Sequence, residues 1–148
     1  MKSEPYVYSI EDLERDGRTH WDGVRNYEAR NHMRDEMTVG DLVLFYHSNA
    51  RPSGVVGIAR VVREGYPDHT AQDPESRYHD PKASPDDPRW FMVDVEFVER
   101  FDEPVTLKRI KAVPELGEMV LVNRSRLSVQ PVEPEEFDRV VAMGRGEA

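Results

Sequence analysis

The chain has 148 residues, a formal net charge of −9 at pH 7 and no cysteine. A chain of this length can bury about two-thirds of its unfolded surface in one core, so we expect a single domain over residues 1–148. The lack of cysteine excludes disulfides and thiolate metal sites. The negative charge excludes a protein that holds duplexes by bulk electrostatic attraction.

No stretch of the sequence approaches the roughly 18 apolar residues of a membrane span, and residues 1–5 lack the apolar part of a signal peptide. We therefore expect an intracellular protein, cytoplasmic in a bacterium and nuclear in a eukaryote. No membrane partner is expected, and a monomer is the starting assumption.

Two short helices are predicted in the first quarter of the chain. Ser9 stands in a near capping-box pattern, which predicts a helix over about residues 9–15. The dipeptide Asp22-Gly23 predicts a turn, and a second helix is expected over about residues 24–34.

Three apolar segments predict the strands of a sheet. Residues 42–47 form an almost unbroken apolar run of strand length, and residues 55–62 are predicted to be its hairpin partner. Gly57 in the second run indicates a bulge or a close backbone approach. Residues 90–100 alternate apolar and polar side chains, which predicts a long strand. The first two strands are expected at the centre of the sheet.

The remaining segments are connections and short elements. Residues 65–89 contain five prolines and many acids, which predicts a long loop that could cover one mouth of the sheet. Short helical turns are expected within 107–122, a closing strand at 126–130 and a final helix over 134–143. The whole pattern predicts an α+β fold, with a small mixed sheet or a partly closed barrel flanked by helices.

The stretch from Trp21 to Asn31 differs from a core segment, because it places two arginines and two asparagines beside one indole. Residues 18–34 carry four arginines against only two acids before Arg34. A local basic face on an acidic body favours recognition of a base or nucleotide over tracking along a backbone. We hypothesise that Trp21 is a stacking platform.

Ten segments of the sequence carry a resemblance to a known family: residues 1–5, 8–13, 21–27, 29–31, 40–49, 56–59, 66–68, 80–82, 88–90 and 126–132. Through these segments the sequence resembles the EVE domain family over residues 2–141. The resemblance implies a PUA-like fold, a small β-barrel of about five to six strands flanked by short helices and related to YTH domains. It also implies a non-catalytic module, without cofactor or metal, that recognises a modified nucleobase or nucleotide in DNA or RNA.

By the same resemblance, four segments line the ligand pocket. They are Lys2 and Ser3, then Trp21, Asp22, Gly23, Val24, Arg25 and Asn26, then Tyr46, His47, Ser48 and Asn49, and finally Trp90. Many members of the family carry two further residues, one aromatic and one apolar, before the motif that begins here at Met1. We therefore expect a short first strand.

Physical chemistry supports a base pocket of this composition. Trp21, opposed by Trp90 or Tyr46, would sandwich an extruded base at roughly 1–3 kcal/mol per stacked base. Edge contacts that distinguish the base would come from the backbone amides near Gly23 and from Ser3, Asn26, Ser48 and Asn49. Arg25 and Arg30 would contact the flanking phosphates.

The same residues also have structural interpretations. Trp21 and Trp90 could be core tryptophans, and the arginines could form surface ion pairs with nearby acids. His69 and His79 lie among acids, but their spacing fits no compact zinc signature, so no metal is expected.

Two other classes of function remain open. A nucleic-acid-modifying enzyme of the glycosylase or nuclease type would need an acid/base pair, for which Glu4, Asp22 and His47 are the candidates. A peptide or methylated side-chain module would use the tryptophans as an aromatic cage for a cation.

Overall fold

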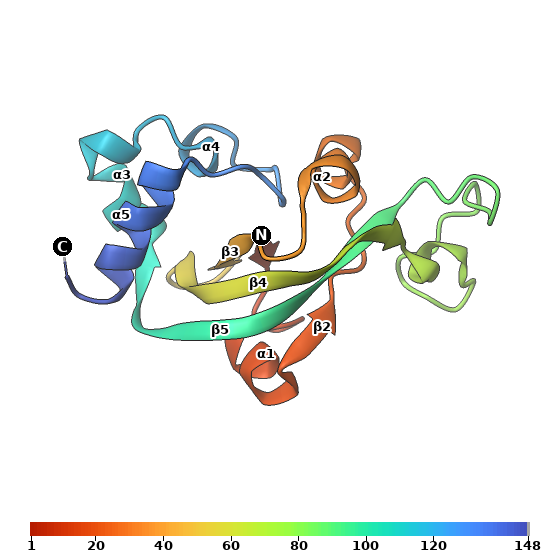
Figure 1. Cartoon of the computed structure of the whole chain (residues 1–148), viewed down its shortest axis with the longest axis horizontal. Coiled ribbons are helices and arrows are strands. Elements are labelled where there is room, and N and C mark those ends of the chain that lie inside the picture. Colours follow the sequence, from red (N-terminus) through yellow and green to blue (C-terminus); the bar gives the residue numbers. More distant parts are fainter. Residues whose placement is uncertain (148) are drawn as a thin grey trace.

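The computed structural model describes residues 1–147, which fold as a mixed α+β structure around one five-stranded sheet (Figure 1). The strands are β1 (Lys2–Ser3), β2 (Arg18–His20), β3 (Leu42–His47), β4 (Gly54–Pro67) and β5 (Phe91–Thr106), in the order β1-β3-β4-β5-β2. β1 runs parallel to β3, and the other pairs are antiparallel. β4 therefore lies at the centre, as part of the hairpin expected there.

Short helices surround this sheet. They are α1 (Ile10–Asp16), α2 (Tyr27–Asn31), the π-helix η1 (His32–Glu36), the 3-10 helices η2 (His69–Gln72) and η3 (Pro114–Leu116), α3 (Leu107–Lys111), α4 (Val120–Asn123) and α5 (Pro134–Gly144). None of the helices found in residues 1–147 has the length and apolar character needed to cross a membrane.

The predicted first helix is confirmed, and the second one begins later than predicted. Ser9 accepts a hydrogen bond from the backbone of Asp12, whose side chain accepts one from Ser9 N–H, so the capping box forms. The second helix begins at Tyr27 because Asn26 is its N-cap, with Oδ1 accepting from Ala29 N–H at 2.9 Å.

The three predicted strands are confirmed, and two of them are longer than predicted. β5 continues past its predicted end to Thr106, which is in register with Gly54. β4 continues to Pro67, in register with Phe91 at the start of β5, so the two strands leave the body of the sheet as a paired ribbon. This ribbon carries the loop that follows residue 67 outward, on the right of Figure 1. At Gly57 the register shifts, and a Cβ there would lie 2.3 Å from Glu99 O. The predicted close backbone approach is therefore confirmed.

The closing strand predicted at 126–130 is wrong, and the sheet does not close into the small β-barrel that the resemblance implies. The small mixed sheet flanked by helices is confirmed. Leu127 and Val129 are buried, which produces the alternating pattern of a strand, but residues 126–130 belong to no strand. One backbone bond, from Lys2 N–H to Ser128 O at 2.9 Å, holds this segment beside β1. The sheet consequently stays open, with β1 and β2 as its edges.

The core consists of two clusters, and alternate side chains of β3 belong to each of them. Val43 and Phe45 pack in a cluster that includes residues of α1 and Trp21. Leu44 and Tyr46 pack in a second cluster with side chains of α3, α4 and α5. The period-two pattern of a strand covered on both faces explains why the run at 42–47 is apolar throughout.

Candidate functional site

Trp21 lies in the first core cluster, with only 8% of its surface exposed. Its backbone N–H donates to Val93 O at 2.8 Å, and its ring meets the Phe45 ring edge-on, with centroids 5.4 Å apart. Trp90 stacks on Tyr27, and the sandwich of a base between Trp21 and either Trp90 or Tyr46 stays a prediction.

Gly23 is the residue that fixes this turn. Its φ is +78°, its N–H donates to Asp68 Oδ2 at 2.8 Å, and a Cβ at this position would lie 2.6 Å from the Tyr78 ring. The fully buried Asp68 also accepts from the backbone and hydroxyl of Thr70. Burial raises the pKa of Asp68, but these hydrogen bonds and that from Arg25 outweigh it, so the pKa is lowered overall.

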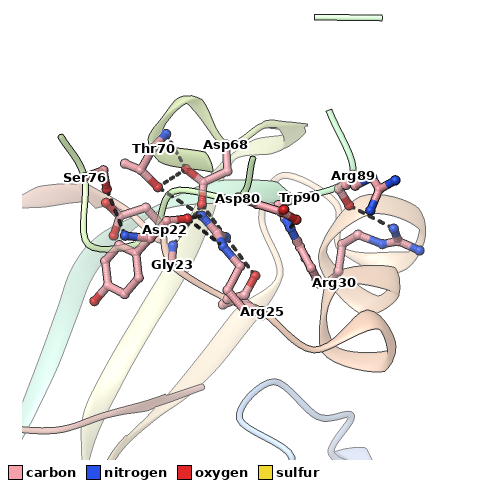
Figure 2. Close-up of polar contacts among 12 residues, drawn as sticks. Asp22, Gly23, Arg25, Arg30, Asp68, Thr70, Ser76, Asp80, Arg89 and Trp90 are labelled. Atoms are coloured by element: carbon pink, nitrogen blue, oxygen red, sulfur yellow. Dashed lines mark hydrogen bonds and ion pairs between the residues drawn. The ribbon is translucent and has the colours of Figure 1, made fainter. Parts of the chain in front are cut away.

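Arg25 joins the turn to the long loop (Figure 2). Its Nε and Nη2 donate to Tyr78 O at 3.1 and 2.8 Å, and Nη2 also donates to Thr70 Oγ1 at 3.3 Å. Its Nη1 donates to Val24 O at 2.9 Å and to Asp68 Oδ2 at 3.1 Å. These five bonds use all five guanidinium donors. The geometry therefore favours a structural role for Arg25 over the phosphate contact predicted from the sequence.

An aromatic pair that we did not predict lies beside Arg25. Trp90 stacks on Tyr27 with centroids 4.7 Å apart and planes 19° apart, and its indole N–H donates to Asp80 Oδ2 at 2.8 Å. The guanidinium of Arg30 lies 4.6 Å from the Tyr27 centroid and donates to Arg89 O at 2.8 Å. Tyr27 is 51% exposed. The i, i+3 spacing of Tyr27 and Arg30 in a predicted helix was the signal for this contact.

The predicted residues of β1 and β3 do come together. Lys2 and Ser3 are in register with Tyr46 and His47, and Ser48 N–H donates to Ser3 O at 3.0 Å. The hydroxyl of Ser3 donates to a backbone oxygen, that of residue 8, at 2.6 Å. These contacts hold the first strand against the end of β3.

The three acid/base candidates have separate surroundings. Nε2 of His47 accepts from Ile10 N–H at 3.1 Å, and burial lowers the pKa of His47. Glu4 accepts from Asn49 Nδ2 at 3.0 Å and from the Tyr6 hydroxyl, and these bonds lower the pKa of Glu4.

Asp22 differs from both, because burial and then the nearby Asp68 raise its pKa. Its carboxylate lies 3.8 Å from His20 Nε2. Asp22, Glu4 and His47 thus each bond to different neighbours.

A small hollow of about 260 Å³, which we call the Asn26 hollow, lies between Asn26 and residues 123–127. Arg124 forms a two-fold ion pair with Glu28, at 2.7 and 3.2 Å, and Lys2 Nζ donates to Ser125 O at 2.7 Å. Sequence reasoning missed this wall, because it treated residues 126–130 as a sheet strand. Asn26 Nδ2 has no hydrogen-bond partner within residues 1–147.

A second cavity of about 630 Å³ opens beside β3. Met1, Lys2 and Tyr46 contribute to its lining, and its other walls include apolar residues such as Leu44 and Phe137. The α-amino group of Met1 donates to Leu44 O at 2.9 Å, and burial lowers the pKa of this amine to about 5. Trp21 and Trp90 do not line this cavity.

The predicted site residues therefore form two groups. Lys2, Ser3, Tyr46, His47, Ser48 and Asn49 form the group at the end of β3. Gly23, Arg25 and Trp90 form the group that contacts the long loop, and Asp22 is the neighbour of Gly23 in the chain. Trp21 and Val24 lie in the core. Lys2 and Asn26 connect both groups to residues 123–127. Within residues 1–147, no three His, Asp or Glu side chains are placed to hold a metal ion.

Known proteins resemble this chain along nearly its whole length. A family model described as "EVE domain" matches residues 1–143. Thymocyte nuclear protein 1 from Homo sapiens is 41% identical over 162 residues, an alignment that covers 97% of this chain and 72% of that protein.

Solved structures show the same similarity. A hypothetical protein from Leishmania major superimposes with a TM-score of 0.95 and 50% identity, covering 99% of this chain and 93% of that one. The human THYN1 protein in complex with 5-methylcytosine containing DNA superimposes with a TM-score of 0.92 and 40% identity. That alignment covers 97% of this chain and 95% of the human one.

Proposed function

The chain belongs to the EVE domain family, and on this premise we propose that it is a non-catalytic module that binds a modified base in DNA. One observation carries the proposal. The human THYN1 protein, which shares the fold over 97% of this chain, was crystallised with DNA that contains 5-methylcytosine. 5-Methylcytosine is therefore the first ligand to test.

The Asn26 hollow has the chemistry that such a base needs. The free amide nitrogen of Asn26 can donate to an acceptor on the edge of the base, and Ser125 adds a hydroxyl. Leu127 is the apolar residue of the lining, and it packs in the same core cluster as Trp21. A methyl group placed against Leu127 would be removed from water, which is worth about 1 kcal/mol.

The contacts of the acid/base candidates support binding without chemistry. His47 uses Nε2 to accept from the start of α1, and Glu4 is bonded to Asn49. General catalysis requires an acid and a base within reach of the same reacting group. Glu4, Asp22 and His47 instead have separate partners, so we propose that none of them acts on the ligand.

The aromatic stack argues against the methylated side-chain module. A cage for a quaternary ammonium needs open ring faces. Here Arg30 lies 4.6 Å from the Tyr27 centroid and Arg25 lies 5.4 Å from the Trp90 centroid, so protein cations already occupy this stack.

Fluorescence anisotropy with labelled oligonucleotides tests the proposal. We expect DNA with one 5-methylcytosine to bind about tenfold more tightly than the same strand with cytosine, since one methyl group is worth about 1–3 kcal/mol in a selective pocket. RNA of the same sequence and a trimethyllysine peptide serve as competitors. Equal affinity for both DNA strands, or displacement by the peptide alone, would contradict the proposal.

The same samples test the absence of chemistry. Mass spectrometry of the oligonucleotides after long incubation should show unchanged strands. Loss of the base or cleavage of the strand would show that the protein is an enzyme.

A further inference from the structure

We infer that cationic groups on opposite faces of α2 hold the DNA strand on the two sides of the modified base, one flank each. This inference rests on the proposed function and deepens it, because it assigns the residues that hold the strand on each side of the base. A free nucleoside or a base at the end of a strand would contact only part of the surface.

The first group lies beside the Asn26 hollow and consists of Lys2, Arg124 and Arg126. Lys2 Nζ is held by Ser125 O at 2.7 Å, and two of its three donors remain. Arg126 lines the hollow, is exposed and has no carboxylate within 4 Å among residues 1–147. A phosphate next to the bound base would find Arg126 in the lining and Lys2 beside Ser125, whereas Arg124 is already paired with Glu28.

The second group lies on the other side of α2 and consists of Tyr27 and Arg30. The Arg30 guanidinium is fixed by the Tyr27 ring, by Arg89 O and by Asn31 Oδ1. These bonds use three of its five donors, and no carboxylate of residues 1–147 lies within 4 Å of it. An immobilised cation with two spare donors is suited to bind phosphate, because little conformational entropy is lost on binding.

Helix geometry separates the two groups. Glu28, which pairs with Arg124, and Arg30 are two positions apart on α2, so their side chains point about 200° apart around the helix axis. Figure 1 shows α2 between the segment that follows α4 and the segment that leads into β5. Asn26 is the N-cap of α2, so the hollow lies at the N-terminal end of this helix.

The net charge of the whole chain determines how a DNA strand can be held. With a net charge of −9, the protein attracts no polyanion at long range, so phosphate contacts must come from a few placed cations. Two such groups that bracket one hollow match a backbone that passes on both sides of one extruded nucleotide.

Neutral methylphosphonate linkages test the inference. One linkage is placed next to 5-methylcytosine, on either side in turn, and affinities are measured for the wild type, Arg126→Gln and Arg30→Gln. In the wild type each neutral linkage should weaken binding roughly tenfold, as expected for a charged hydrogen bond. In each variant, the neutral linkage on one side of 5-methylcytosine should no longer weaken binding, while the linkage on the other side still does. The side that loses its effect should differ between the two variants.

Controls separate folding from binding. Arg139→Gln removes an exposed charge on α5 and should keep full sensitivity to both linkages. Arg30→Lys keeps the charge without the planar stack, and melting curves of all variants report whether the fold is intact. The inference is wrong if both variants become insensitive to the linkage on the same side, or if neither becomes insensitive to any linkage. It is also wrong if a terminal 5-methylcytosine binds as tightly as an internal one.

The experiment distinguishes failure of this inference from failure of the proposed function. If the wild type binds cytosine and 5-methylcytosine strands equally but keeps the two-sided phosphate pattern, the modified-base proposal fails and the strand inference stands. If the preference for the modified base persists without any phosphate pattern, only the strand inference fails.

Discussion

At the scale of single residues, the turn after Trp21 depends on one glycine and one arginine. Gly23 adopts a left-handed φ of +78° directly under the Tyr78 ring, and Arg25 bonds to the same loop residue. The sequence identified both positions as special. It did not show their partners, because Asp68 and Tyr78 lie more than forty positions away in the chain.

Replacement of Gly23 by alanine should destabilise the protein in two ways, by straining the backbone and by pushing against the Tyr78 ring. A left-handed φ costs a non-glycine residue about 1–2 kcal/mol, and the new Cβ would also displace the Tyr78 ring. We expect the free energy of unfolding to fall by about 2–3 kcal/mol in urea titrations. In a Tyr78→Ala background the Gly23→Ala cost should shrink to the backbone part, and an unchanged cost would contradict the predicted contact.

Arg25→Gln should affect stability rather than phosphate binding. The substitution leaves the buried Asp68 without its cation, which costs about 3 kcal/mol for a broken buried pair. The salt dependence of DNA binding should keep its slope, because Arg25 has no spare donor. A lower slope with unchanged stability would restore the phosphate contact predicted from the sequence.

At the scale of elements, His47 joins α1 to the sheet. His47, on β3, accepts from the backbone N–H of Ile10 at the start of α1, so its Nε2 must be unprotonated. Burial lowers the pKa of His47 below its usual 6.5. Protonation of the imidazole would break the hydrogen bond and place a charge in the core.

Stability should therefore fall on mild acidification. The unfolded chain takes up the His47 proton near pH 6.5 and the folded chain only at lower pH, so the contribution of His47 to the free energy of unfolding decreases between these two values and is constant above the first. The buried Met1 amine, whose pKa is lowered from 8.0 to about 5, adds a decrease of its own that begins near pH 8. Urea titrations from about pH 7.5 to 5 should show this decrease in the wild type, and His47→Gln should reduce it. An equal decrease in both proteins would assign the effect to other groups.

The elements also show where patterns in the sequence are informative. Capping residues and turn residues act locally, so Ser9 correctly predicted α1. Alternation reports burial rather than strand pairing, so Leu127 and Val129 were buried as the pattern requires while their segment formed no strand. The end of β4 after residue 62 carries no apolar pattern, yet it forms a strand because it pairs with the apolar start of β5.

At the scale of the whole molecule, the candidate site is built from distant parts of the chain. Lys2, Asn26 and Ser125 meet around one hollow although they come from the beginning, the first quarter and the last quarter of the sequence. Resemblance to the EVE domain family pointed to the first two segments. The third was assigned to the wrong element, because a single sequence does not show which segments converge.

The measurement that tests the account most directly compares the wild type with Asn26→Ser on strands with 5-methylcytosine and with cytosine. Serine keeps the N-cap of α2 but removes the free amide nitrogen, so the melting temperature should change little. We predict that the wild type prefers 5-methylcytosine about tenfold and that the variant binds this strand about tenfold more weakly. Unchanged affinity of Asn26→Ser for the modified strand would contradict a base site at Asn26.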